Sequence, residues 1–115
     1  MLKSGNIFSG VRPAAAGEQT TTLAARRGAV VERIVSAGQA SPPGFWYDQR
    51  WTEWVTVLAG EAGLRIEGEA AARTLRAGDW LELPARVRHR VEWTSADPPT
   101  VWLAVHWKDD AQGFS

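Results

Sequence analysis

From about residue 29 onward, the chain alternates short apolar runs with polar breaks. The runs cover residues 29–36, 51–59, 64–67, 72–76, 80–83, 88–93 and 100–107. Most of the breaks contain glycine or proline, and no stretch repeats its apolar residues with a helical period. Short strand-like runs at this spacing are typical of a β-sandwich or β-barrel. We therefore predict one all-β domain over residues 29–108, with a turn over residues 60–63.

The two ends of the chain lack this pattern. Residues 1–28 are rich in Ala, Gly, Ser and Thr and are interrupted by Pro13, which favours an N-terminal arm that is irregular in part. A short helix over residues 20–27 is the alternative. Residues 109–115 are predicted to form a frayed C-terminal tail.

Two of the runs have apolar residues on both faces of the predicted strand. They are residues 54–58 (WVTVL) and 101–105 (VWLAV). A strand with one solvated face would alternate apolar and polar residues. Both runs therefore need cover on their outer face, from the arm, a second sheet or another subunit. We predict a homodimer.

Composition excludes several classes of protein. At 115 residues, the chain has room for one domain that buries roughly two-thirds of its unfolded surface. The absence of cysteine excludes disulfides, thiolate metal sites and cysteine nucleophiles. Thirteen basic and thirteen acidic residues balance, whereas nucleic-acid-binding proteins normally carry a basic surface. No run is long enough to span a membrane and no secretory pattern opens the chain, so we expect a cytoplasmic protein.

Strand periodicity places candidate functional groups on common faces. The chain holds seven tryptophans, enough to build an aromatic core or to line a pocket. Residues two apart on a strand share a face, so Tyr47, Gln49, Trp51 and Glu53 are predicted to point one way. His89 and Trp93 lie in a second inward row. A carboxylate and an imidazole would then meet between Trp51 and Trp93.

Two stretches of the chain resemble the paired motifs of the cupin superfamily. Glu53-x6-Gly60 resembles the end of G-x5-H-x-H-x3,4-E-x6-G, with Tyr47 and Gln49 in place of its two histidines. The stretch Gly78-x5-Pro84-x4-His89-x3-Trp93 resembles G-x5-P-x-G-x2-H-x3-N, with Trp93 in place of its asparagine. The resemblance covers roughly residues 30–107 and implies a double-stranded β-helix (jelly-roll) barrel, often dimeric, with a site inside its mouth.

The resemblance also implies a metal, but the sequence retains few of its ligands. Of the usual three histidines and one glutamate, Glu53 and His89 remain. Gln49 through its amide oxygen and Tyr47 as a phenolate are the candidates that would complete a site for Zn, Ni, Fe or Mn. The alternative is that Glu53 and His89 pair with each other, because buried polar groups are usually satisfied within the protein.

Three functions are compatible with these residues. We favour a small-molecule-binding protein whose barrel pocket is lined by Trp51, Trp93, Tyr47 and Gln49 and holds at most a weak metal site. The second is a metal-dependent enzyme of the dioxygenase or isomerase type, with Glu53 and His89 as catalytic residues. The third is a structural or regulatory homodimer with a filled barrel. His106 shares a face with Trp102 and is a further candidate for ligand binding or for a general base. The sequence leaves open whether the protein is an enzyme.

Overall fold

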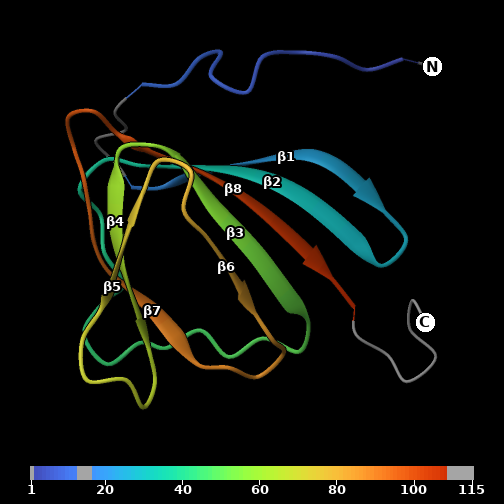
Figure 1. The fold of residues 1–115 in the computed structure, drawn as a ribbon. Helices are drawn as coiled ribbons and strands as arrows, with labels where there is room; N and C mark the ends of the chain where they lie inside the picture. The colour runs from blue at the N-terminus through green and yellow to red at the C-terminus, as the bar shows by residue number, and fades with distance from the viewer. Residues whose placement is uncertain (1, 13–16, 109–115) are drawn as a thin grey trace.

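The protein is an all-β barrel of eight strands (Figure 1). The computed structural model describes residues 2–12 and 17–108. The strands are β1 (Gln19–Arg26), β2 (Ala29–Ser36), β3 (Thr52–Ala59), β4 (Glu61–Ile66), β5 (Arg73–Arg76), β6 (Trp80–Leu83), β7 (His89–Thr94) and β8 (Thr100–Trp107). They form a five-stranded sheet in the order β1-β2-β8-β3-β6 and a three-stranded sheet in the order β5-β4-β7. Every pairing is antiparallel.

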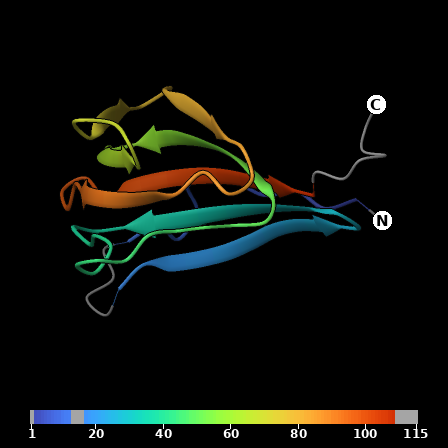
Figure 2. The same ribbon diagram turned by 90° about the horizontal axis from the view of Figure 1, so that it is seen from below.

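The two sheets enclose a common apolar core. Its buried members come from both sheets: Val55, Val57, Ala62, Leu64, Leu75, Leu83, Trp102 and Ala104. Figure 2 shows the strands of the larger sheet running side by side. The described part of the chain contains no helix long and apolar enough to cross a bilayer.

The predicted strands agree closely with the observed ones. β2, β6 and β8 have the predicted bounds, and β3, β5 and β7 begin one residue later than predicted. The turn predicted over residues 60–63 is confined to a bend at Gly60, because β4 already begins at Glu61. Gly63 lies inside that strand, where an added Cβ would collide with the indole of Trp93. A glycine is needed at position 63 because the Trp93 side chain packs against it, and it does not mark a turn.

The N-terminal region is more ordered than predicted. Residues 19–26 form β1, which pairs with β2 along its whole length, so neither an irregular arm nor a helix describes them. Three consecutive threonines favour this extended edge strand. Further upstream, the Arg33 guanidinium donates hydrogen bonds to the carbonyls of Ile7 (3.1 Å) and Ser9 (2.6 Å). These bonds hold that segment against the outer face of the larger sheet. The interruption predicted at Pro13 and the tail predicted over 109–115 lie outside the described residues.

Candidate functional site

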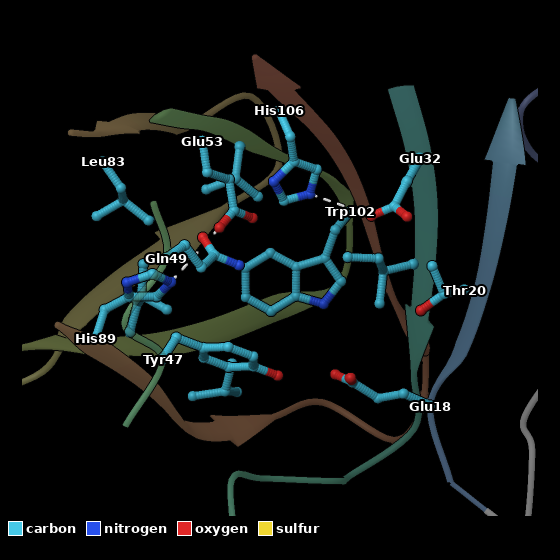
Figure 3. A pocket seen from close by; sticks show the side chains of 14 residues that line it. Glu18, Thr20, Glu32, Tyr47, Gln49, Glu53, Leu83, His89, Trp102 and His106 are labelled. Carbon is cyan, nitrogen blue, oxygen red and sulfur yellow. Dashed lines mark hydrogen bonds and ion pairs between the residues drawn. The ribbon is translucent and has the colours of Figure 1, made fainter. Parts of the chain in front are cut away.

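The barrel is hollow. A cavity of about 320 Å³ opens between the sheets, which does not fit the alternative of a completely filled barrel. Its lining combines apolar side chains with carboxylates, imidazoles and two aromatic rings (Figure 3). The lining residues are Glu18, Thr20, Glu32, Ile34, Tyr47, Gln49, Glu53, Val55, Leu64, Leu83, His89, Val91, Trp102 and His106. Concave, largely apolar sites with a few convergent polar groups are the usual form of a small-molecule pocket.

Glu53 and His89 meet inside this cavity. Glu53 is carried by β3 and His89 by the first position of β7, and both side chains are almost fully buried. The Nε2 of His89 lies 3.5 Å from Oε1 of Glu53. Because side chains two residues apart on a strand share a face, the carboxylate of Glu53 and the imidazole of His89 lie on the inward faces of separate strands, as predicted.

The hydrogen bond of His89 Nδ1 determines which ring nitrogen carries the proton. Nδ1 lies 3.0 Å from the carbonyl of Val87, which can only accept, so Nδ1 carries a proton. In a neutral ring, Nε2 then presents a lone pair toward the Glu53 carboxylate, which is also an acceptor when ionised. One further proton, on either the imidazole or the carboxyl, makes the contact favourable. The carboxylate of Glu53 and the imidazole of His89 are therefore placed as a candidate acid–base pair at the cavity wall.

Tyr47 fixes the position of the His89 ring. The two residues exchange backbone hydrogen bonds of 2.7 and 3.2 Å, and their rings stack with centroids 5.2 Å apart. The loop before Tyr47 is held to β7 by Arg90, whose guanidinium donates to the carbonyls of Ser41, Pro42 and Phe45. These bonds hold Tyr47, a loop residue, in a fixed position in the cavity wall.

The environment of Tyr47 disfavours a phenolate. Burial, and then the charges of Glu18 and Glu53, raise the pKa of the phenol above its ordinary value of 10.0. All three causes oppose ionisation. The phenolate ligand considered from the sequence is therefore not supported by the site.

This shift is directly measurable because Tyr47 is the only tyrosine of the chain. We expect its ultraviolet difference titration to show a midpoint above 10.0 in the folded protein. Since the unfolded chain ionises this group first, the contribution of Tyr47 to stability is retained below pH ~10 and is lost as the pH rises toward the folded pKa. Glu18→Gln should lower the midpoint, whereas a midpoint at the unfolded value would contradict this geometry.

His106 lies at the mouth of the cavity, with both ring nitrogens occupied. Nδ1 accepts a hydrogen bond from the indole N–H of Trp51 (3.0 Å), and Nε2 lies 3.1 Å from Oε1 of Glu32. Because an indole nitrogen can only donate, this network assigns the neutral tautomer with its proton on Nε2. His106 therefore lines the pocket, but its network leaves no lone pair free for a metal.

The predicted aromatic walls are placed differently. Trp51 precedes β3 at a bend, so strand parity does not apply to it, and it lies at the rim beside His106. Trp93 is turned out of the barrel, and the prediction that it points inward is wrong. β7 carries one extra residue after Val91, since Leu64 pairs with Val91 while Gly63 pairs with Trp93. Such a bulge reverses the facing of the residues that follow it.

The predicted site lacked three lining residues that contribute an aromatic ring or a carboxylate. Trp102, the one buried tryptophan in the described chain, supplies the wall expected from Trp51 and Trp93. Glu32 lies between Val30 and Ile34 on one face of β2, and this polar residue in an apolar row was a readable signal. Glu18 directly precedes β1 and accepts a 2.6 Å hydrogen bond from Ser36. No sequence pattern marks it, because its segment was interpreted as an arm.

A second hollow lies outside the first, at the rim. It measures about 400 Å³ and shares Glu32, Gln49 and His106 with the inner cavity. Trp51 and Trp107 contribute aromatic surface to it, and Arg26 and Lys108 contribute positive charge. The rim therefore differs from the interior in both charge and exposure.

The donor set of the inner cavity does not fit a tightly held divalent metal. Among the described residues, no three His, Cys, Asp or Glu side chains are grouped to hold one ion. Glu53 and His89 supply two donors, and the neutral amide of Gln49 would be the third. Catalytic zinc sites use three protein ligands drawn mainly from His, Cys and carboxylate groups.

The family of the chain follows from its match to known sequences. The family model of the Cupin domain matches residues 31–106, which cover the barrel strands except β1 and include the Glu53–His89 pair. The chain is a cupin. The resemblance noted in the two motifs is thereby confirmed, together with the all-β barrel it implied. No curated protein matches this cupin significantly.

Solved structures support the same assignment. A protein from Ralstonia eutropha JMP134, provisionally named a mannose-6-phosphate isomerase, is 53% identical to this cupin with a TM-score of 0.91. The similarity covers 94% of this chain and 100% of that chain. A cupin superfamily protein from Desulfitobacterium hafniense DCB-2 shares 16% identity over 86% of this chain and 84% of its own, with a TM-score of 0.72. At that identity the likeness concerns the fold alone.

Proposed function

We propose that this cupin binds a small molecule inside its barrel and that binding needs no resident metal. The observation that carries the proposal is the cavity of about 320 Å³ into which the Glu53–His89 pair opens. At roughly 30 Å³ per water-sized group, this volume suits a ligand of about ten non-hydrogen atoms.

The polar groups of the cavity are arranged to orient such a ligand. The Gln49 amide makes no hydrogen bond within the described part of the chain, so its donor and acceptor are both available. Trp102 offers a ring face, and its indole N–H is already satisfied by Ser36 at 3.1 Å. Apolar residues on both sheets complete the lining. These groups suit a small ligand with a ring that stacks on Trp102 and makes a few polar contacts.

A small-molecule panel monitored by tryptophan fluorescence tests this proposal. We expect saturable quenching by at least one compound in the wild type and none in a Val91→Phe variant, which fills the cavity. Val31→Phe adds the same bulk to the opposite-facing row of β2 and should leave the response unchanged. The absence of any saturable response in the folded wild-type protein would overturn the proposal.

Metal analysis of the purified, tag-free protein tests the second part. We expect Zn, Ni, Fe and Mn at well below one equivalent, because the described residues group no three His, Cys, Asp or Glu side chains around one point. Stoichiometric metal that disappears in Glu53→Ala or His89→Ala would establish a metal centre. The proposal of a metal-free site would then be wrong.

A second candidate, an isomerase working by proton transfer, is favoured by the position of the His89 imidazole 3.5 Å from the Glu53 carboxylate inside the cavity. It is also suggested by the provisional name of the Ralstonia eutropha protein. His89 would act as the base toward a sugar carbon, and a phosphate would have to lie at the rim near Arg26 and Lys108. NMR of mannose 6-phosphate in deuterated water tests it through formation of the ketose phosphate. Activity lost in His89→Phe would establish this candidate, and inactivity of the folded wild type would exclude it.

We further propose that the protein is a homodimer. On the face of the larger sheet that points away from the cavity, Trp54 and Trp80 stack with centroids 5.9 Å apart. Trp80 remains 59% exposed. Exposed aromatic surface of this kind is enriched at protein interfaces. Sedimentation velocity should show a dimer that Trp80→Lys weakens, and a wild-type monomer at high concentration would contradict the proposal.

A further inference from the structure

The charges around the inner cavity do not balance. Three carboxylates line it, those of Glu18, Glu32 and Glu53, and none of its described lining residues is Lys or Arg. In Figure 3 these three carboxylates surround the indole of Trp102 from different strands and segments. The negative groups therefore lie around one enclosed volume and are not gathered on a single surface.

Two of these carboxylates have neutral hydrogen-bond partners. Glu18 accepts from the hydroxyl of Ser36. Glu32 accepts from the Nε2–H of His106, whose neutral form is assigned by the Trp51 bond to Nδ1. Only Glu53 has a partner, His89, that would offset its charge by taking a proton. At least two carboxylate charges therefore face the cavity without a fixed counter-charge.

The pKa of Tyr47, which is raised first by burial and then by nearby carboxylates, is consistent with the same negative potential. Glu18 and Glu53, at opposite sides of the cavity, both contribute to that shift. A negative potential in a partly desolvated space attracts cations more strongly than it would in water. The faces of Trp102 and Tyr47 add to this attraction, because aromatic rings bind organic cations through their electron-rich faces.

We infer that the inner cavity selects a small organic cation, an alkylammonium group attached to about ten non-hydrogen atoms or fewer, and rejects anions of the same shape. This inference rests on the proposed small-molecule function and specifies its ligand class. The ammonium group would lie against the Trp102 face between the carboxylates. The size limit follows from the cavity volume of about 320 Å³.

Three probes of nearly the same shape but different charge test the inference. They are choline, its neutral carbon isostere 3,3-dimethylbutan-1-ol, and the anion 3,3-dimethylbutanoate. By calorimetric titration at low salt, we expect choline to bind at least about tenfold more tightly than the alcohol, with the anion weakest. Choline affinity should fall as salt is added, whereas that of the alcohol should not.

Variants that remove single charges test which carboxylates are responsible for the preference for choline. Glu18→Gln and Glu32→Gln keep an acceptor for Ser36 and His106, so the hydrogen bonds survive while the charge is lost. Each should weaken choline about tenfold and leave the alcohol unchanged. Glu82→Gln, on the exposed face of β6, is the matched control and should alter neither ligand.

The outcomes separate this inference from the proposal beneath it. If the alcohol or the anion binds as tightly as choline, charge selection is wrong while small-molecule binding stands. If none of the three probes binds but other compounds quench fluorescence, the cation class is wrong and the pocket remains. If no compound of any charge binds, both proposals fail.

Discussion

Replacing Gly60 by alanine is expected to destabilise the protein by about 3 kcal/mol, enough to lower Tm by more than ~10 °C. Gly60 forms the bend between β3 and β4, with φ of +74°. An added Cβ would lie 2.5 Å from Oγ of Ser95, 2.7 Å from the carbonyl oxygen of Pro99 and 2.8 Å from Cα of Thr100. Two of these neighbours are backbone atoms, which cannot move aside as a side chain can.

Gly68→Ala is the matched control for this variant. Gly68 also has a positive φ, of +93°, but no atom lies within 4 Å of its added Cβ. Only the backbone strain of about 1–2 kcal/mol then applies. Chemical denaturation of both variants should show Gly60→Ala as clearly the less stable. Equal losses would contradict the close packing of the 94–100 segment against Gly60.

The second large effect concerns the Glu53–His89 pair. Removal of His89 as His89→Phe keeps a ring to stack on Tyr47 but leaves the Glu53 carboxylate buried without a partner. We expect a loss of about 3 kcal/mol in the free energy of unfolding. Glu53→Leu should cost less, because a neutral imidazole is easier to leave unpaired. The double variant should recover part of the loss, since two apolar groups can pack together.

A double-mutant cycle measures this coupling. We expect a coupling energy of about 1–3 kcal/mol for Glu53 and His89. The exposed ion pair of Arg88 and Glu67, 2.8 Å apart, serves as a control and should give less than ~0.5 kcal/mol. Additive losses for Glu53 and His89 would mean that the two side chains do not interact in the folded protein.

The strands could be predicted because local pattern and tertiary environment agree along most of the chain. β2, β6 and β8 begin and end at turn-forming or polar residues that are visible in the sequence. β1 was missed, because its threonines favour a strand but its residues show no apolar–polar alternation, and its pairing with β2 is what fixes it as a strand. Gly63 misled the prediction of the turn, since a glycine required by a neighbouring ring is indistinguishable in sequence from one required by a turn.

The acid and the imidazole of the site could be predicted from the sequence, but the aromatic residues around them could not. Strand parity holds for Glu53 and His89, so the acid and the imidazole converge as the period of two requires. It fails for Trp51 at a bend and for Trp93 after a bulge, because both features shift the facing of a residue without leaving a sequence signature. Glu18 reaches the cavity through β1 pairing, a long-range contact that local pattern does not encode.

The central claim is that the barrel encloses a space accessible to a ligand beside Glu53 and His89. The most direct measurement is a heteronuclear NMR titration that follows the tryptophan indole N–H groups and the His89 ring. Binding should shift the Trp102 and His89 signals saturably and leave those of Trp80 and Trp93, which lie outside the cavity, unmoved. If every compound that binds shifts only the outer tryptophans, the barrel interior is closed and the account is wrong.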